Sequence, residues 1–277
     1  MIKQNCTWNL EKLLINQYIQ SMKICPRCGS KKWWHLSTGQ IRCSNCSLTR
    51  KLSKNIWKKT RISPYWKGRL VDYFCLGVPA YRLRFQVPYS QPTILRWFRN
   101  LREVIYQDII KDLKPLSGEI EMDETMFGGK RPGKRGWGAV GKWIVFGIYQ
   151  RNGKVLTFPI SSRAKETMRP YITRYTKAGS LYYTDEWFAY TFLPIRGNHV
   201  VVLKEKGMPK GRNHMNGIEG FWSFAKHWLY QYRGIPRAYF PFYLKEVEWR
   251  FNHRNENLVI LLRRLLNQQI SIVKEQI

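Results

Sequence analysis

Short apolar segments separated by turn residues dominate the second half of the chain. Five of them are rich in β-branched and aromatic residues and are predicted as strands, at residues 118–127, 142–150, 154–161, 180–186 and 199–205. Asn152-Gly153 favours a hairpin turn between the second and third strands. A helix is predicted over 165–178, with a possible interruption at Pro170, and a longer helix over 216–232. The apolar face of the longer helix consists of Ile218, Phe221, Trp222, Ala225 and Leu229.

This succession of elements resembles that of a ribonuclease H-like domain, in which three strands, a helix, a strand, a helix-like segment, a strand and a helix follow one another. We therefore expect an α/β fold, with a mixed five-stranded sheet and helices, over residues 116–277. In such a sheet the first and fourth strands can lie side by side. Acidic residues on those two strands would then meet near the centre of the sheet.

The preceding segment, from residue 48 to 111, has a helical pattern. A short helix ending at Gly77, a turn region and a longer helix form the outline of a helix-turn-helix, and we assign residues 51–115 to a DNA-binding region of that kind. Ser90 is a candidate cap of the second helix. The candidate DNA contacts are the polar residues Thr93, Arg96 and Arg99. The alternative is a small helical bundle that links the flanking domains.

Four cysteines in two C-x2-C pairs predict a zinc ribbon within residues 1–50, after a short N-terminal helix. The pairs, Cys25 with Cys28 and Cys43 with Cys46, can supply the four thiolates of one structural Zn²⁺. Lys31 and Lys32, between the pairs, are candidate DNA contacts. The alternative is a redox-active or chance pairing. The remaining two cysteines are expected to be ordinary thiols.

The net charge of the chain indicates which class of molecule it binds. The chain has 48 Lys and Arg against 18 Asp and Glu, a formal net charge of +30, spread along its whole length. This distribution favours binding to nucleic acid, with a basic ribosome-associated protein as the plainer alternative. Lys130 and Arg131, in a Gly- and Lys-rich loop, are further candidate DNA contacts. No apolar run approaches the roughly 20 residues of a membrane span, and no secretory signal is evident, so we expect an intracellular protein, located in the cytoplasm or nucleoid if the source is bacterial.

Three acidic residues stand in contexts suited to catalytic metal ligands: Asp123 and Asp185 in predicted strands, and Glu219 in the following helix. Half-buried carboxylates are costly unless they are paired or bound to a cation. Carboxylate oxygens are ligands for hard ions such as Mg²⁺, and two such ions can serve phosphoryl transfer. Their neighbours Glu124 and Glu186 are interpreted as solvated surface charges.

Three further residues complete the candidate site. Lys226 lies seven residues, or two helical turns, beyond Glu219 and is expected on the same face of the helix, towards the substrate phosphates. His214 and Asn216 are near enough to assist as accessory residues. Asn216 is also a candidate N-cap of the helix that carries Glu219.

Four motifs carry a resemblance to a known family: EMDETMFGGK, YYTDEWFAY, H-x-N-G-I-E-G-F-W-S-F-A-K and EVEWRFNHR. In this order they resemble ISXO-type insertion-sequence transposases, relatives of the Merlin transposons. The resemblance implies a DDE transposase in which Asp123, Asp185 and Glu219 hold two Mg²⁺ or Mn²⁺ ions and Lys226 accompanies the glutamate. It also implies cleavage at terminal inverted repeats, joining to target DNA, and a homodimer or higher assembly. Residues 246–254 have no evident chemical role and are predicted as a helix behind the site.

Two other functions stay open. The first is a non-catalytic DNA-binding regulator derived from a transposase. The second is a metal-dependent nuclease or resolvase on the same fold, which cuts DNA without joining it.

Overall fold

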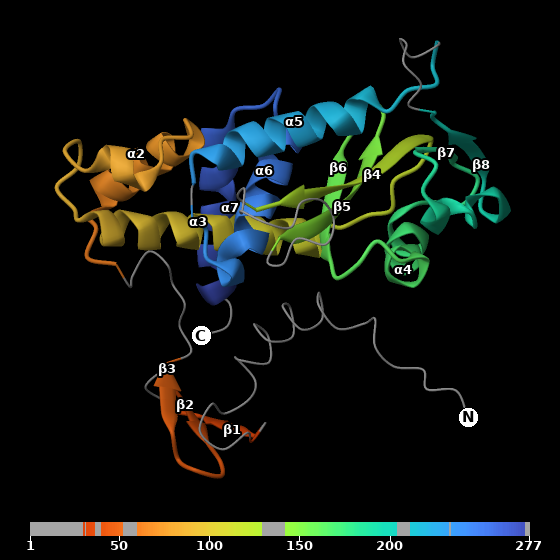
Figure 1. The fold of residues 1–277 in the computed structure, drawn as a ribbon. Coiled ribbons are helices and arrows are strands. Elements are labelled where there is room, and N and C mark those ends of the chain that lie inside the picture. Colours follow the sequence, from red (N-terminus) through yellow and green to blue (C-terminus); the bar gives the residue numbers. More distant parts are fainter. Residues whose placement is uncertain are drawn as a thin grey trace.

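The structure is a computed structural model and describes residues 30, 32–36, 40–51, 60–128, 142–203, 211–232 and 234–274 (Figure 1). The described residues form two separate sheets. The smaller one is antiparallel and consists of β1 (Trp33–His35), β2 (Gln40–Cys43) and β3 (Thr49–Lys51). Residues 49–51 were predicted to begin a helical segment, and this is wrong, because they pair with β2 along its length.

The larger sheet has five strands in the order β6-β5-β4-β7-β8. Its strands are β4 (Glu119–Phe127), β5 (Trp143–Gln150), β6 (Val155–Ile160), β7 (Leu181–Thr184) and β8 (Asn198–Val201). β5 is antiparallel to both of its neighbours, β4 and β6, whereas β7 and β8 run parallel to β4. This mixed five-stranded α/β arrangement confirms the ribonuclease H-like fold expected from the order of elements.

The hairpin predicted at Asn152-Gly153 joins β5 to β6. Gly153 N–H donates to the Gln150 carbonyl at 2.9 Å, and Asn152 takes the positive φ of 59° that the turn requires. The crossover to β7 contains α4 (Lys165–Tyr175), which continues through Pro170 without a break. Short 3-10 turns follow at Phe188–Tyr190 and Leu193–Ile195, and a further one lies at Arg237–Tyr239.

The two faces of the large sheet carry separate hydrophobic cores. One face packs on α4 through residues such as Met122, Phe158 and Ile172. The other packs on α5 (Asn216–Tyr230), whose predicted apolar face is buried as expected. Gly147 on β5 makes this second contact possible, because a Cβ there would lie 2.5 Å from a ring carbon of Trp222.

The helical region precedes the sheet in sequence but shares its core with the end of the chain. It comprises α2 (Pro64–Cys75), η1 (Ala80–Leu83) and α3 (Gln91–Lys111). These pack in one hydrophobic cluster with Trp249 of α6 (Phe240–Asn252) and with Leu262 and Leu266 of α7 (Leu258–Lys274). Gly77 follows α2 with φ 78°, the conformation of a helix-ending glycine. Ser90 precedes α3 as expected of a cap, although its hydroxyl pairs with that of Thr93 at 3.0 Å.

Helix α6 contains the motif for which no role was evident, and it attaches the helical region to β6. Glu248 accepts hydrogen bonds from the backbone N–H and the hydroxyl of Thr157, and Lys245 donates to the Thr157 carbonyl. Asn252 bonds both the N–H and the carbonyl of Val155. The predicted helix is confirmed up to Asn252, and its polar residues bond the outer edge of the sheet.

A buried ion cluster lies on the other side of α6. Glu246 accepts from Arg102 of α3 at 2.6 Å and from Arg250 at 2.9 Å. Arg250 also donates to the carbonyls of Phe74 and Cys75, which are among the last carbonyls of α2. One carboxylate thus joins three helices. None of the described helices is both long and apolar enough to cross a membrane.

Candidate active site

Asp123 lies on β4, and Asp185 directly follows the neighbouring parallel strand β7. The pairing of the two strands sets Glu121 opposite Tyr183, and each aspartate follows its paired residue by two positions. Asp123 is half-buried, and the Asp185 side chain is 27% exposed just beyond the end of β7. Both charges help to raise the pKa of the same buried phenol, Tyr190. The two strands are neighbours in the sheet, as the prediction that these aspartates approach each other requires.

Behind the aspartates lies a buried acid. Glu124 accepts hydrogen bonds from Arg163 at 2.9 Å and from the Tyr190 hydroxyl, and only 5% of the residue is exposed. The prediction that it is a solvated surface charge is wrong, because β4 is the central strand and both of its faces are covered. Burial raises the pKa of Glu124 to about 7, with a further contribution from Asp123, although Tyr190 and Arg163 oppose the shift. Glu186, in contrast, is exposed as predicted.

Arg163 connects this buried acid to the site. Its guanidinium pairs with Glu124 at 2.9 Å and lies 3.9 Å from Asp185, while it stacks 4.2 Å above the ring of Trp187. Trp187 in turn donates its backbone N–H to Asp185 and its indole N–H to the Arg163 carbonyl. The position of the Asp185 carboxylate is thus fixed from two directions.

Glu219 lies in the first turn of α5, on the helix that was predicted to carry it. The start of α5 is held against β4, because Ile218 N–H donates to the Glu121 carboxylate at 2.8 Å. Gly217 permits this approach, since a Cβ there would lie 2.1 Å from a ring carbon of Tyr149. Ile218 and Trp222, which are one turn apart on α5, pack over Gly147, and Gly147 is paired with Asp123. Helix α5 therefore crosses the sheet beside the first aspartate.

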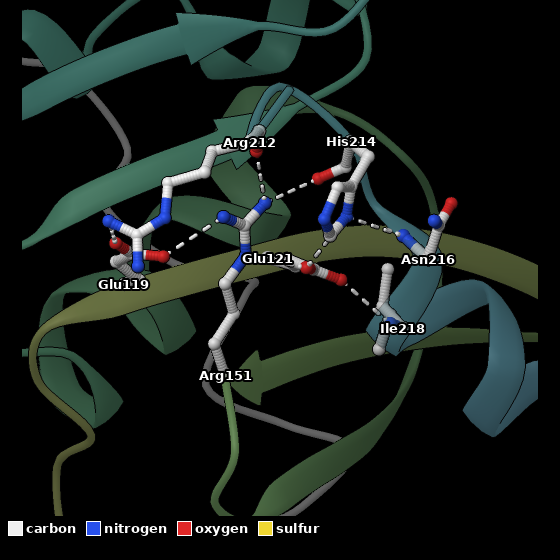
Figure 2. Close-up of polar contacts among 7 residues, drawn as sticks. All are labelled: Glu119, Glu121, Arg151, Arg212, His214, Asn216 and Ile218. Carbon is white, nitrogen blue, oxygen red and sulfur yellow. Dashed lines mark hydrogen bonds and ion pairs between the residues drawn. The ribbon is translucent and has the colours of Figure 1, made fainter. Parts of the chain in front are cut away.

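The buried Glu121 belongs to a polar network that anchors this helix (Figure 2). Arg151, after β5, donates to Glu121 at 2.8 Å and to Glu119 at 2.9 Å. It also donates to the backbone carbonyls of Arg212 and His214 in the segment before α5, and stacks 3.7 Å above the ring of Tyr183. Burial lowers the pKa of Arg151, but its bonds to Glu121 and Glu119 outweigh burial and raise it. One guanidinium thereby joins β4, β7 and the entry to α5.

The accessory candidates lie in or beside this network. His214 is 30% exposed, and its Nδ1 is 3.8 Å from the Glu121 carboxylate. Asn216 is the first residue of α5 rather than its N-cap, which is Met215, so the predicted capping role is wrong. The backbone N–H of Asn216 is instead directed at the His214 ring, at 3.4 Å.

Glu219 and Lys226 are both exposed on α5, two turns apart. Their common face is therefore open to a substrate. Within the ranges that the structure describes, no three His, Cys, Asp or Glu residues are close enough together to hold a metal ion. Asp123, Asp185 and Glu219 therefore form no three-carboxylate cluster in this structure.

The other predicted residues are distributed as follows. Arg96 on α3 and Lys32 before β1 are exposed, and Thr93 is half-buried. Arg99 stacks 4.2 Å above the ring of Tyr239, so part of its surface is engaged within the protein. Lys31, Lys130, Arg131, Cys25 and Cys28 lie outside the described residues.

Only the second pair of the predicted zinc site can be placed. Cys43 ends β2 and Cys46 lies in the turn that follows, where Ser47 N–H donates to the Cys43 carbonyl at 3.1 Å. Ser47 has φ 57°. The two thiols are therefore on one tight turn next to the small sheet.

Four residues of the site were not predicted: Glu121, Glu124, Arg151 and Arg163. Glu121 had a signal in the sequence, because residues two apart on a strand share a face and Asp123 was already a candidate. Arg151 and Arg163 had no such signal in the sequence, because each contacts partners that are distant along the chain.

The sheet order, with two acidic residues on its adjacent central strands, defines a ribonuclease H-like protein. The ISXO2-like transposase domain family matches residues 115–252. An uncharacterized transposase-like protein of Haemophilus influenzae is 33% identical over 123 residues, which are 44% of this chain and 92% of that protein. The chain belongs to the ISXO2-like transposase family, which confirms the resemblance found in its motifs.

Solved structures with some similarity include a pre-cleavage Mos1 transpososome, 10% identical over 76% of this chain and 79% of that one, with a TM-score of 0.23. The Mos1 strand transfer complex is 11% identical over 73% of this chain and 78% of that one, with a TM-score of 0.24. Similarity at this level supports no argument about the present chain.

Proposed function

We propose that the protein is an insertion-sequence DNA transposase that binds terminal inverted repeats and cleaves and joins DNA strands by a DDE two-metal mechanism. The observation that supports it best is the register that brings Asp123 beside Asp185 in a chain of the transposase family. Neither aspartate is deeply buried, so their carboxylates can be reached from solvent. A charge of +30 provides the surroundings that a polyanionic substrate needs.

The donor set suits Mg²⁺ or Mn²⁺, because carboxylate oxygens are the ligands these hard ions prefer. Asp123 and Asp185 would hold the ions, with Glu219 as the third ligand, two ions to each site. When bound, such ions activate an attacking oxygen and stabilise the leaving one. Glu219 would have to approach the aspartates for this role, and it is exposed in the first turn of α5.

The protein's own residues then position the substrate and the ligands. The exposed amine of Lys226 is suited to bind a substrate phosphate on the face of α5 that carries Glu219. Arg163 and the Trp187 N–H orient Asp185. Arg151, through Glu121, fixes the start of α5 and hence the distance of Glu219 from the sheet.

The N-terminal region would recognise the ends of the element. Cys25, Cys28, Cys43 and Cys46 would bind one structural Zn²⁺, with Lys31, Lys32 and the residues of α3 meeting DNA. Purified protein should contain about one zinc per chain, and Cys43→Ser should lose it. Stoichiometric iron, or no metal, would contradict this assignment. Because two ends must be held together, the active complex should be a homodimer or larger.

One observation favours a non-catalytic regulator instead. Glu219 is exposed, and no three-carboxylate cluster is assembled among the described residues, as would be expected if the site had lost its activity. The regulator and the transposase differ in what Asp185→Ala changes, because a regulator has no activity to lose.

The deciding experiment supplies Mg²⁺, labelled element ends and a target plasmid, and measures joined products. Asp185→Ala should retain binding to the ends and lose joining by at least about a thousandfold, since several kcal/mol of transition-state stabilisation depend on it. Glu186→Ala, which removes an exposed neighbouring acid, is the matched control and should join normally. A wild type that binds the ends but yields no joined product would contradict the proposal, and cut but unjoined ends would indicate a nuclease.

A further inference from the structure

A cavity of about 640 Å³ lies at the opposite end of α5 from Glu219. It is formed by η1, the first half of α3, and the residues that connect α5 to α6. Figure 1 shows α5 running from the large sheet towards α2, so its last turn lies well away from the acidic site. The residues around the cavity take no part in the chemistry described above.

The lining is aromatic and positively charged. Tyr81 and Tyr230 enter it from different elements, and they are 48% and 69% exposed. Arg82, Arg99 and Arg102 supply three cations, whereas none of the lining residues that the structure describes is acidic. Stacking faces next to guanidinium groups are how proteins bind unpaired nucleotides, because every base has a π-face and every nucleotide carries a phosphate.

The buried guanidinium of Arg102 adds positive charge at the floor of the cavity. Its side chain is 1% exposed, and its guanidinium lies 3.8 Å from the centre of the Tyr243 ring. Its Nε donates to Glu246, but neither Nη atom has a hydrogen-bond partner among the described residues. Glu246 is shared with Arg250, so one negative charge faces two positive ones. The floor of the cavity thus keeps an excess of positive charge.

Size and position indicate a nucleotide rather than a duplex. The volume lies in the range of about 300–1,000 Å³ that is usual for small-molecule pockets, and a double helix cannot enter such a space. From Glu219 to Tyr230 is eleven residues of α5, or about 16 Å along the helix axis, which equals roughly five base steps of B-form DNA. Lys226 is exposed between the two sites on the same helix.

We propose that this tyrosine pocket binds a nucleobase that has left the DNA stack about five steps from the cleaved phosphate, with its backbone against Arg82 and Arg99. The proposal rests on the proposed function, since it assumes a DNA substrate at the acidic site. Unstacking a base costs a few kcal/mol, and stacking on the tyrosines offsets that cost. The pocket would thereby hold the strand at a fixed distance from Asp123 and Asp185.

The first test compares two DNA probes, a short fluorescent oligothymidine and a blunt duplex of the same length. The double variant Tyr81→Leu/Tyr230→Leu should bind oligothymidine at least about tenfold more weakly, because it lacks the aromatic faces on which a base can stack, and should bind the duplex as the wild type does. Tyr65→Leu is the matched control. Tyr65 is a tyrosine on α2 that is 67% exposed and lies outside the pocket.

The second test uses oligothymidine that contains 5-iodouracil, irradiated with the wild-type protein and mapped by mass spectrometry. Crosslinks at Tyr81 or Tyr230 are expected. Crosslinks only elsewhere, or a double variant with wild-type affinity for oligothymidine, would overturn the pocket while leaving the transposase proposal intact. A wild type that binds neither probe would overturn both, and a wild type that binds only the duplex would overturn the pocket alone.

Discussion

The acids of the β4–β7 site and those of α6 have the same chemistry and opposite surroundings. Glu246 and Glu248 are fully buried, and each pairs with a cation, Glu246 with two arginines and Glu248 with Lys245. Asp185 is 27% exposed, and its nearest described cation, Arg163, is 3.9 Å away and is more closely engaged with Glu124. Glu219 is exposed.

This difference separates acids that hold the fold together from acids that are available to a ligand. A buried carboxylate whose charge is already matched by arginine or lysine has little to gain from a metal ion. A half-buried carboxylate beside another one is under electrostatic strain, which a cation relieves. Removal of an acid should therefore cost stability at α6 and activity at the sheet.

The largest effect is expected at α6. Glu246→Ala leaves Arg102 and Arg250 buried without their shared partner and should lower the free energy of unfolding by about 3–5 kcal/mol, measured by urea denaturation. Glu186→Ala, at an exposed glutamate, should change it by less than about 0.5 kcal/mol. If the two variants were equally stable, the buried cluster would have no structural role.

The second largest effect is the pH dependence of stability that Glu124 causes. This residue is buried like the acids of α6 but belongs to the strand that carries Asp123. Its pKa is about 7 when folded and near its ordinary value of 4.5 when unfolded. Between these values the folded state keeps a proton that the unfolded state has lost, so the free energy of unfolding should fall as the pH rises from 4.5 to 7 and then level off. The loss is about 3 kcal/mol at most.

Urea denaturation across this pH range, in EDTA so that no divalent ion shifts the titration, measures the slope. Glu124→Gln should flatten it, because the neutral amide cannot titrate. Glu186→Gln should keep the wild-type slope. An unchanged slope in Glu124→Gln would mean that the buried acid titrates normally.

A smaller effect is expected from Arg151→Lys. The lysine keeps the charge but cannot bond Glu119, Glu121 and two carbonyls at once, so the start of α5 should loosen. We expect joining to slow by about tenfold, or roughly 1.4 kcal/mol, with DNA affinity unchanged and a higher Mg²⁺ concentration needed for half-maximal rate. The Mg²⁺ dependence distinguishes a misplaced Glu219 from a general loss of folded protein, because a loss of folded protein would lower the rate at every Mg²⁺ concentration.

Arg212→Lys is the matched control for that variant. Arg212 is 85% exposed at the rim of the same network, 3.7 Å from Glu119, and its replacement should leave the Mg²⁺ dependence unchanged. Equal behaviour of the two variants would remove Arg151 from the positioning role.

The smallest effect should be on the stability of Asp185→Ala. Its side chain is 27% exposed and its ion pair with Arg163 spans 3.9 Å, so the free energy of unfolding should change by less than about 1 kcal/mol, in either direction. A loss comparable to that of Glu246→Ala would place this acid in the structural class.

Much of the fold was predictable because it depends on local patterns. The strands, the Asn152-Gly153 hairpin and the apolar face of α5 follow from the residues within each segment. The neighbouring positions of Asp123 and Asp185 followed from the order of elements. Burial of Glu124 was not predictable in this way, because alternation along a central strand does not tell which faces are covered.

The anchoring of the site depends on long-range contacts. Arg151 reaches a segment more than 60 residues later in the chain, at Arg212 and His214. The role of EVEWRFNHR required knowing that α6 lies along β6 and against α2. Its polar residues bond distant backbone groups, such as Thr157 N–H and the Cys75 carbonyl, which the motif itself does not reveal.

The attachment of α6 to β6 has a consequence for assembly. An edge strand normally offers its backbone groups to any other strand that can pair with it. On β6, side chains of Glu248, Lys245 and Asn252 already bond the groups of Thr157 and Val155. At the other end of the sheet, no described strand pairs with the outer side of β8. A strand that added to the β6 edge would therefore first have to displace these side chains from Val155 and Thr157.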